Sequence, residues 1–568
     1  LGVIEIIGTF GEPVTDEPGI FVDPWGLDSN PGTKSWPKKT MQGAMDAVRD
    51  FKQVNGLPEE GLNVYFRGGK YFVDSMTNFG SADSGEQGKP VTYQSYPGER
   101  ARFIGGIELN GSDFTQVTSS HAVWSRIDDA AKGNLLKMNL QGYNIADYGA
   151  PADSPSELSF NKEIMQLGRL PNETYALTTS PTTDPTFTYT GTRAERWTNA
   201  EEPYISGQLN NGYFSSIIEV ANIDTSNKII TLAESPLGRG CHPDKAWSII
   251  NVFEEIDHPG EYFIDKANHI LYFWPPSDVS DAELLLSTYG DSSARFFDID
   301  GTSYVQFKNI TFEMFRNRMS KVWSSDSLTF DGCIFRNGGG SAVTFTNTMN
   351  LTIKNSRFYD LGKTTISFYN CGDRYSLTKS NNVITNNYFN GTGRWKSGIS
   401  YAPPIWLYST NCGFTISHNK FEDTRHCGIV VFGGVLATVE YNRFHNCAYE
   451  ADDCAAIYTA GRWVAQQGAV YRYNEFYDIK NKNLPGDYGN HRVRPLYYDG
   501  CSGASAIGNI AHTLDDRIWY NNNGRNVYYK DNIAVNGGRV YYARDEDSSR
   551  GCDLLDEILA FDYDIPGS

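Results

Sequence analysis

An aromatic residue returns at a nearly fixed interval through the second half of the chain, usually two places after an asparagine. Phe312, Phe335 and Phe358 are 23 residues apart, and Phe421 and Phe444 repeat that spacing. The other intervals lengthen to 31, 32, 32 and 35 residues, and the last copies carry alanine in the same place. A constant period with occasional extra length is typical of one repeated unit whose insertions leave from loops.

The length and composition of this repeat favour a stack of short strands. About 23 residues is too short for a helix pair or a propeller blade, and it suits one coil of a parallel β-solenoid. Asparagine at a fixed place in each coil suits left-handed turns and stacked side-chain amides. The sequence therefore predicts an all-β parallel β-helix. The repeat signature occurs at Asn387–Phe389, Asn419–Phe421, Asn442–Phe444 and Asn474–Phe476, with degenerate copies at Asn509–Ala511 and Asn532–Ala534.

The rest of the chain divides according to where the repeat is visible. Residues 1–102 are expected to form an N-terminal cap and the first coils, in which the amphipathic stretch Thr40–Phe51 predicts a helix that plugs the open end. Between 103 and 285 the period vanishes while strand-like runs persist, which predicts an inserted small β-sandwich or barrel. Residues 286–545 are predicted to form the main β-helix, and 546–568 a short acidic tail.

Charge and hydropathy exclude several classes of partner. The formal net charge of -19 argues against nucleic acid, which needs a basic surface. It also mildly disfavours a sulfated or uronate-rich substrate. No run of 18 apolar residues is present, so no membrane span is expected. Leu1 is not an initiator methionine, which fits the removal of a leader.

The nine cysteines show no pattern of a disulfide framework or a metal site. Cys427, Cys447 and Cys454 stand at different distances from the aromatic that precedes each of them, so stacked disulfides between equivalent positions are not predicted. No Cys/His spacing typical of a metal site is found. We therefore expect buried, apolar thiols, no metal and no cofactor.

Long connections on one edge of such a solenoid would wall a groove above a strand face. Insertions between repeat copies mark this edge, and aromatic side chains there suit stacking on sugar rings. Packing into the interior is the alternative for any one of them. The aromatic candidates are Trp395, Tyr401, Trp406, Trp463, Tyr497 and Tyr498.

The densest group of titratable residues lies just before the run Ala456–Tyr458. If Ile429, Ile457, Leu496 and Ile518 are equivalent strand positions, residues just before each of them form a column of acids and bases. Clustered carboxylates push one pKa upward, as acid–base chemistry requires, whereas a solvated acidic turn balanced by arginines is the alternative. The candidates are His426, Glu450, Asp452, Asp453, Arg492, Arg494, Asp499, Asp515 and Asp516.

Several of these motifs resemble one family. The stretches Glu450–Tyr458 and Leu496–Gly503, with Arg394–Trp395, Tyr401–Pro403, His426–Ile429 and His258–Asp265, are similar to bacterial right-handed parallel β-helix proteins that include glycoside hydrolase family 141. That family has α-L-fucosidase and xylanase activities. The likeness covers about residues 20–540. It implies that the acidic pair of the family falls on Asp453 and Asp499.

The geometry of this pair leaves an alternative open. Asp453 precedes its strand and Asp499 follows its own, seven positions apart around the coil, which at about 3.3 Å per residue exceeds the roughly 5–10 Å between glycosidase carboxylates. A sharp bend would bring the two together. Without one, Asp453 with Asp515 or Asp516 is the better pair.

Together these features predict a secreted or periplasmic glycoside hydrolase acting on plant or algal polysaccharides or oligosaccharides, with Asp453 and Asp499 as acid and base or nucleophile. His426, Arg462 and Arg492 would orient the sugar or tune the acids, and Trp395, Tyr401, Trp463 and Tyr497 would build subsites, beside Glu450, Asp515 and Asp516. The first alternative is a polysaccharide lyase on a uronate-containing glycan, using Lys396, Arg492, Arg494 or His426. The second is a non-catalytic glycan-binding β-helix.

Overall fold

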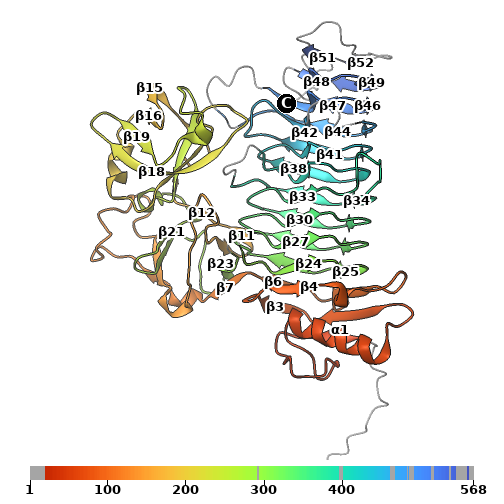
Figure 1. Cartoon of the computed structure of the whole chain (residues 1–568). Helices are drawn as coiled ribbons and strands as arrows, with labels where there is room; N and C mark the ends of the chain where they lie inside the picture. Colours follow the sequence, from red (N-terminus) through yellow and green to blue (C-terminus); the bar gives the residue numbers. More distant parts are fainter. Residues whose placement is uncertain are drawn as a thin grey trace, which may run out of the picture.

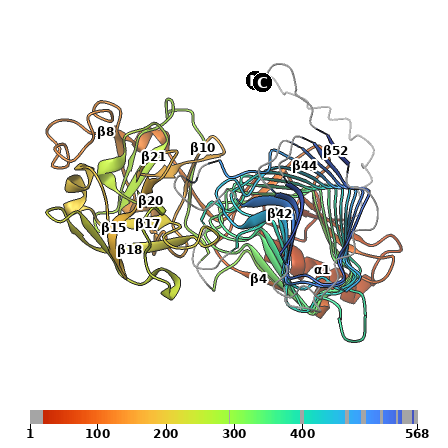
Figure 2. The ribbon, with the colours of Figure 1, turned by 90° about the horizontal axis from the view of Figure 1, so that it is seen from above.

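Parallel strands stack along one axis for most of the length of the molecule (Figure 1). The computed structural model describes residues 19–290, 293–395, 401–460, 467–482, 484, 492–512, 517–535, 539–544 and 559–561. Within these residues three long parallel sheets run the length of a single solenoid, two of twelve strands and one of eleven. Seen along the axis, they enclose one common interior (Figure 2). The chain is thus a right-handed parallel β-helix, and this prediction is confirmed.

Each coil contributes one strand to each sheet, and neighbouring coils pair in parallel. The first twelve-stranded sheet contains β1 (Ile20–Val22), β2 (Leu62–Phe66), β5 (Val91–Ser95), β25 (Val305–Lys308), β28 (Thr329–Asp331), β31 (Thr352–Lys354), β34 (Asn382–Thr385), β37 (Phe414–Ser417), β40 (Thr438–Glu440), β43 (Val470–Arg472), β46 (Ser505–Ile507) and β49 (Tyr528–Lys530). The eleven-stranded sheet contains β4 (Thr77–Phe79), β24 (Phe297–Asp300), β27 (Ser320–Trp323), β30 (Val343–Thr346), β33 (Ile366–Tyr369), β36 (Ile405–Tyr408), β39 (Ile429–Val431), β42 (Cys454–Ala460), β45 (Val493–Asp499), β48 (Arg517–Asn522) and β51 (Arg539–Arg544). The second twelve-stranded sheet contains β3 (Gly69–Phe72), β6 (Ala101–Ile104), β26 (Thr311–Glu313), β29 (Ile334–Arg336), β32 (Arg357–Tyr359), β35 (Tyr388–Asn390), β38 (Lys420–Thr424), β41 (Arg443–Cys447), β44 (Glu475–Tyr477), β47 (Ile510–His512), β50 (Ile533–Val535) and β52 (Leu559–Phe561).

The repeated aromatic forms a column of stacked rings inside the solenoid. Phe335 and Phe358 have ring centroids 4.8 Å apart and an interplanar angle of 3°. The column continues through Phe389, Phe421 and Phe444 at separations of 4.6 to 4.9 Å. These spacings match the distance between hydrogen-bonded strands, so successive coils bring their rings into stacking contact.

The signature asparagines form a buried ladder beside this column. Asn442 donates its side-chain amide to the carbonyl of Ile416 at 2.9 Å and to Oδ1 of Asn474 at 3.0 Å. Its own Oδ1 accepts the backbone N–H and the side-chain amide of Asn419. The left-handed conformation belongs to the residue before each signature asparagine, such as Tyr441, with φ of 54°. The stacked amides that the repeat predicts are therefore present.

A helix covers the N-terminal end of the core. Helix α1 (Met41–Asn55) starts at Thr40, whose hydroxyl accepts the N–H of Gly43, and ends at Gly56 with φ of 70°. Its apolar face, which includes Met45 and Val48, is buried against the first coils. Figure 1 shows the helix below the stack, where it closes the apolar interior. No helix among the described residues combines the length and the apolar character needed to cross a membrane.

The insert leaves the solenoid after β6 and returns at β24, so it spans about residues 105–296, where the sequence pattern places 103–285. It forms two lobes beside the stack (Figures 1 and 2). The lobe nearer the N-terminal coils holds a sheet of β7 (Gly106–Leu109), β10 (Leu158–Phe160), β11 (Glu163–Ile164) and β23 (Leu284–Ser287), and another of β8 (Thr115–Gln116), β9 (Leu136–Asn139), β12 (Gln166–Leu167), β21 (Glu261–Asp265) and β22 (Ile270–Phe273). The other lobe holds β13 (Arg169–Leu170), β14 (Ala176–Leu177), β15 (Thr179–Thr183), β16 (Thr186–Thr188), β17 (Tyr204–Gly207), β18 (Ser216–Asp224), β19 (Ile229–Leu232) and β20 (Ala246–Ile250).

Short 3-10 turns occur at η1 (Ser81–Asp83), η2 (Gly111–Asp113), η3 (Gln141–Tyr143), η4 (Arg193–Asn199), η5 (Pro236–Gly238) and η6 (Phe253–Glu255).

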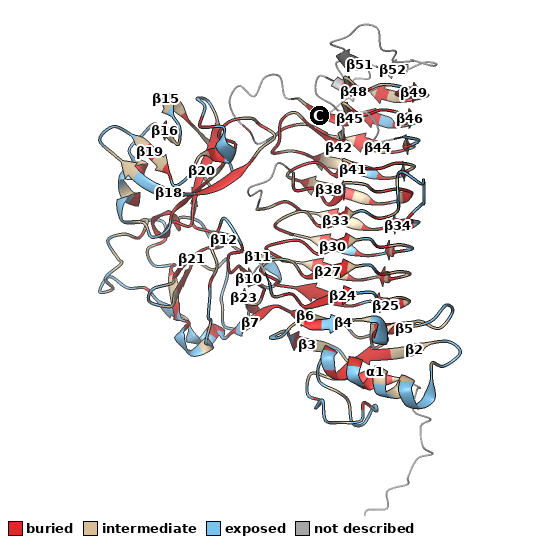
Figure 3. Cartoon of the chain, in the orientation of Figure 1, coloured by how far each residue is buried: buried red, intermediate tan, exposed pale blue. Residues whose placement is uncertain are grey.

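Ion pairs and hydrogen bonds hold the insert against the turns of the solenoid. Arg394 of the solenoid pairs with the buried Glu157 of the insert at 2.6 Å, and Arg316 pairs with Asp147 at 2.8 Å. Farther along, the backbone N–H of Asp452 donates to the carbonyl of Gly212 at 2.9 Å. The insert is therefore fixed beside the acidic cluster. Residues coloured as buried occur in the solenoid and in both lobes (Figure 3).

Candidate functional site

The acidic cluster lies where three neighbouring coils meet in the eleven-stranded sheet. Ile429 pairs with Ile457, and Ile457 pairs with Leu496, as the sequence alignment of these strands predicts. Between β45 and β48 the predicted pairing is shifted by one residue, because Leu496 pairs with Trp519 and not with Ile518. The prediction was wrong there: Trp519 takes the inward position, where its indole meets the ring of Phe476 in the interior.

The structure distinguishes the two adjacent acids before β42. Asp452 is completely buried and accepts the backbone N–H and the guanidinium of Arg492, both at 2.9 Å. Asp453 has φ of 51°, and its side chain keeps 26% of its surface exposed. A left-handed residue at this point turns the chain sharply. Asp452 is thus an internal anchor, and Asp453 is the acid that solvent reaches.

Asp499 ends β45 in the next coil and is partly exposed. Its Oδ2 accepts the hydroxyl of Tyr458 at 2.5 Å, and its Oδ1 accepts the side-chain amide of Asn522 at 2.8 Å. Burial, followed by the charges of Tyr401 and Asp499, raises the pKa of Tyr458. This phenol therefore stays protonated and donates a hydrogen bond to the carboxylate. Both oxygens of Asp499 are therefore held in a fixed orientation.

Arg494 and Tyr497 lie between the two carboxylates. Arg494 is 1% exposed, donates to Asp453 at 3.1 Å, and packs over the rings of Tyr497 and Tyr520 at 4.6 and 4.1 Å. Burial raises the pKa of Tyr497 first, and the charges of Asp453 and Asp499 raise it further. The charges of both carboxylates therefore act on the hydroxyl of Tyr497, although Asp453 and Asp499 are seven positions apart around the coil.

Aromatic side chains form a continuous row on the outer side of this sheet, but Trp406, Tyr458 and Tyr497 in it are buried, so the expected contact of Tyr497 with a sugar does not fit its burial. Tyr458 stacks on Tyr401 at 5.2 Å and meets Tyr497 edge-on at 5.1 Å. Tyr401 also meets Phe432 at 5.4 Å. The row continues away from the acids through Trp406, Tyr408 and Tyr369, with 40% of Tyr408 exposed. Tyr498 does not belong to it: its side chain is fully buried against Tyr471 and Tyr529 in the interior.

His426 lies beneath the surface of the site. It is 2% exposed, its Nδ1 accepts the N–H of Cys427 at 2.8 Å, and its Nε2 lies 3.4 Å from the carbonyl of Tyr213. Both ring nitrogens are therefore engaged with the protein. His426 is placed to support Tyr401, whose ring it meets edge-on at 5.0 Å, and direct contact with a sugar, the sequence-based expectation, does not fit its burial.

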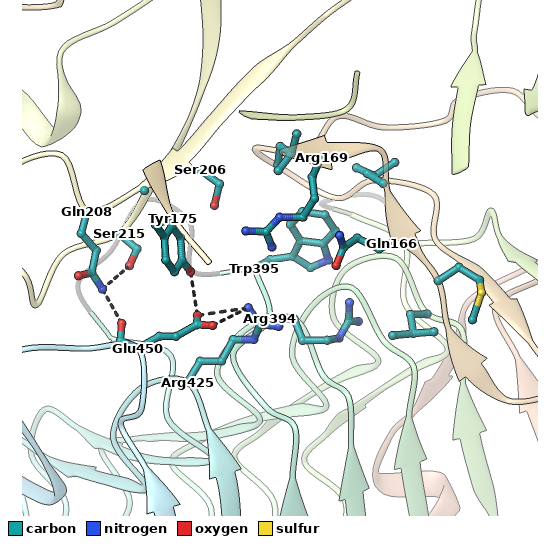
Figure 4. Close-up of a pocket in the computed structure, with 15 residues that line it drawn as sticks. Gln166, Arg169, Tyr175, Ser206, Gln208, Ser215, Arg394, Trp395, Arg425 and Glu450 are labelled. Atoms are coloured by element: carbon teal, nitrogen blue, oxygen red, sulfur yellow. Dashed lines mark hydrogen bonds and ion pairs between the residues drawn. The ribbon is translucent and has the colours of Figure 1, made fainter. Parts of the chain in front are cut away.

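A pocket of about 150 Å³ opens between the insert and the solenoid next to this cluster (Figure 4). Glu450 lies at its floor, where it accepts the hydroxyl of Tyr175 at 3.0 Å and pairs with Arg425 at 3.2 Å. Burial lowers the pKa of Arg425 and the Glu450 carboxylate raises it, with a net upward shift. Glu450 of the solenoid therefore bonds to side chains of both parts of the molecule.

Trp395 forms another wall of the pocket. Its indole N–H donates to Glu157 at 2.7 Å, and its ring covers Gly362, where an added Cβ would lie 2.5 Å from the indole. Arg169 projects from the insert above the indole (Figure 4) and donates to the hydroxyl of Ser248. The pocket thus combines an indole, guanidinium groups and hydroxyls, a mixture that suits a polar ring-shaped ligand.

The predicted site residues therefore separate into groups. Asp453, Asp499, Tyr401, Tyr497 and Arg492 gather at the acidic cluster, and Glu450 and Trp395 line the adjoining pocket. Arg462, Trp463, Asp515, Asp516 and Lys396 lie outside the described residues. Sequence reasoning missed Tyr458 as a partner of Asp499, as well as Tyr175, Arg425 and Glu157. The place of Tyr458 in the site could have been predicted from the sequence, because the aligned strands place Tyr458 and Tyr497 side by side.

Comparisons with known proteins agree with the fold. A family model described as a right-handed β-helix region matches residues 246–402. None of the curated proteins matches the chain. A solved structure titled "Glycoside hydrolase" is similar with a TM-score of 0.64 and 14% identity, covering 92% of this chain and 97% of that one. Another, "The complex structure of XylC with xylose", has a TM-score of 0.51 and 11% identity, covering 96% and 86%. At these identities the likeness shows the fold alone.

Proposed function

We propose that the protein is a carbohydrate-active enzyme, and specifically a glycoside hydrolase with Asp453 and Asp499 as its catalytic carboxyl groups. The observation that carries this proposal is that both acids are linked to Tyr497 in a row of aromatic rings. Asp453 is linked through Arg494, which packs over the Tyr497 ring, and Asp499 through Tyr458, which meets that ring edge-on. The similar folds titled "Glycoside hydrolase" and "XylC with xylose" support a sugar substrate. Membership of glycoside hydrolase family 141 remains a prediction from the sequence motifs.

The two acids have distinct surroundings that suit distinct roles. Asp499, fixed by hydrogen bonds to Tyr458 and Asn522, suits the base or nucleophile, since both its oxygens are oriented before substrate arrives. Asp453 would then donate the proton to the leaving oxygen. Because Arg494 lies 3.1 Å from Asp453 and favours its charged form, this role requires that the bound substrate displace the guanidinium from the carboxyl group.

The state of the arginines favours hydrolysis over elimination. A polysaccharide lyase needs a cation free to neutralise the uronate carboxylate of its substrate. Here Arg492 is bonded to Asp452 and Arg494 to Asp453, and both nitrogens of His426 are engaged. Nε of Arg492 and Nε and Nη2 of Arg494 have no hydrogen-bond partner among the described residues, but these atoms are buried away from the surface that a polymer reaches. The net charge of -19 also disfavours an acidic polymer. We therefore propose a neutral plant or algal polysaccharide or oligosaccharide as substrate and a secreted or periplasmic location, because polymers do not enter cells.

The test replaces each acid by its amide. On a panel of neutral polysaccharides and their oligosaccharides, Asp453→Asn and Asp499→Asn should each lower kcat at least about 100-fold, the usual contribution of a positioned acid or base. Asp331→Asn is the matched control, since Asp331 is also 26% exposed and also bonds a basic side chain, but lies on β28 in another sheet. Full turnover in both site variants would refute the assignment.

Two further outcomes identify the alternatives. Products that absorb ultraviolet light would show a new double bond conjugated to a carboxylate, and therefore a lyase. Retention of a glycan by the parent protein and by both variants, with no product released from any member of the panel, would show a non-catalytic binding protein.

A further inference from the structure

A pair of thiols lies directly behind the acidic cluster. Cys427 precedes β39, Cys454 begins β42 in the next coil, and both are completely buried. Their sulfur atoms are 2.6 Å apart, closer than two sulfur atoms pack without a bond between them. Cys454 immediately follows Asp453, so whatever joins these sulfurs also holds the turn that presents the proposed catalytic acid.

We propose that Cys427 and Cys454 form a disulfide bond that ties neighbouring coils together beneath the site. Adjacent strands in a parallel sheet are about 4.8 Å apart, which lies within the range of about 4.4–6.8 Å that disulfide-linked Cα atoms span. The pairing of Ile429 with Ile457 places the two cysteines nearly opposite each other. Closing the bond therefore needs only a small movement of the sulfurs.

A metal ion is the other way to bring thiolates together, and the arrangement fits it less well. His426 and the two cysteines offer three ligand atoms within 4.8 Å of one another. Two thiolates on one tetrahedral zinc would lie about 3.8 Å apart, given zinc–sulfur bonds of about 2.3 Å. The Nδ1 atom of His426 nearest to Cys454 already accepts the N–H of Cys427. A covalent bond between the sulfurs explains their 2.6 Å separation and leaves the hydrogen bond from Cys427 to His426 in place.

The chemistry needs an oxidant, for which a low-molecular-weight disulfide such as oxidised glutathione suffices. The thiol of one cysteine loses its proton to solvent and attacks a sulfur of this disulfide, which releases one small thiolate and leaves a mixed disulfide. The second cysteine, deprotonated in turn, attacks the protein-bound sulfur and expels the second small thiolate. Two electrons pass to the small disulfide, and each released thiolate takes up a proton. Since both sulfurs are buried, the exchange takes place while the chain folds.

The test counts and locates the linked thiols. The full chain is refolded with oxidised glutathione, denatured, alkylated without reduction, digested and examined by mass spectrometry. The expected result is one cross-linked peptide pair that contains Cys427 and Cys454 and disappears after reduction. Cys447→Ala is the matched control. Cys447 lies in the same coil as Cys454 and is equally buried, but its thiol donates to backbone carbonyls. This control should keep the cross-link, whereas Cys427→Ala and Cys454→Ala should lack it.

A second measurement covers variants that fold poorly. Reductant should lower the Tm of the parent and of Cys447→Ala by the same amount, and should leave the Tm of a Cys427→Ala/Cys454→Ala protein unchanged. Complete alkylation of both cysteines in the refolded parent would overturn the proposal. So would a zinc ion retained in one-to-one ratio that Cys454→Ala loses, since it would show a metal site, and so would a cross-link to any other cysteine. Neither readout depends on whether the protein hydrolyses a glycan.

Discussion

Replacing Asn442 by alanine should destabilise the whole solenoid, because this residue occupies the middle of the buried amide ladder. Its side chain is 1% exposed and takes part in four hydrogen bonds. In the alanine variant the backbone N–H of Asn419 and one proton of its side-chain amide lose their acceptor, and the carbonyl of Ile416 and Oδ1 of Asn474 each lose a donor.

The expected loss follows from the number of groups left without a partner. A buried donor that loses its acceptor costs about 1–3 kcal/mol, and two such donors remain on Asn419. The free energy of unfolding should therefore fall by about 2–6 kcal/mol. A water that entered the space left by the amide and bonded to Asn419 would bring the loss to the lower end of this range.

The assay is urea unfolding followed by circular dichroism, with two matched variants. Asn390→Ala removes a partly exposed asparagine that makes one long bond of 3.4 Å to Asp423, so its midpoint should hardly change. Ser356→Ala lies at the end of the ladder, where the serine hydroxyl accepts from Cys333 at 3.2 Å, and should have an intermediate effect. Equal midpoints for Asn442→Ala and Asn390→Ala would refute the reasoning that the ladder stabilises the stack.

The remaining predictions concern acid stability and the proposed site. The Arg102 guanidinium holds the pKa of Glu283 at about 2, well below its usual 4.5, so the ion pair contributes fully above pH 4.5 and its contribution is lost as pH falls toward 2. Glu283→Gln should therefore cost about 1–2 kcal/mol at pH 7, since solvent screens part of the ion pair, and less near pH 2, as measured by urea midpoints at both pH values; a constant difference would contradict this. Tyr458→Phe removes the hydroxyl that fixes Asp499 and should lower kcat/KM about 10-fold with little change in Tm, and unchanged kinetics would show that this bond does not orient the acid.

The repeat determines the fold because its residues occupy the interior in every coil. The phenylalanine column and the asparagine ladder both follow from sequence positions alone. The alanine at 511 has a physical reason, since it pairs with Phe476 and the indole of Trp519 lies 6.1 Å from the ring of Phe476, where it takes up space next to this position. The insert carries no repeat, so only its β character was predictable.

The details of the site depend on features that spacing cannot reveal. The exposure of Asp453 and the burial of Asp452 result from a single left-handed residue, and no pattern distinguishes two adjacent aspartates beforehand. The thiol pair was missed because the cysteines were counted from the phenylalanine column. Counted from the paired residues Ile429 and Ile457, they stand two and three positions upstream, close enough for a diagonal contact.

The insert is attached to the solenoid through one antiparallel stem, in which Gly106 of β7 pairs with Ser287 of β23. Hydrogen bonding within the solenoid continues directly across this attachment point, from β4 to β24 and from β6 to β26. Nearly two hundred residues can therefore be exchanged at a single hairpin without interrupting the strand pairing of the solenoid. Selection can reshape the wall that faces the substrate while the coils that present the acids stay as they are.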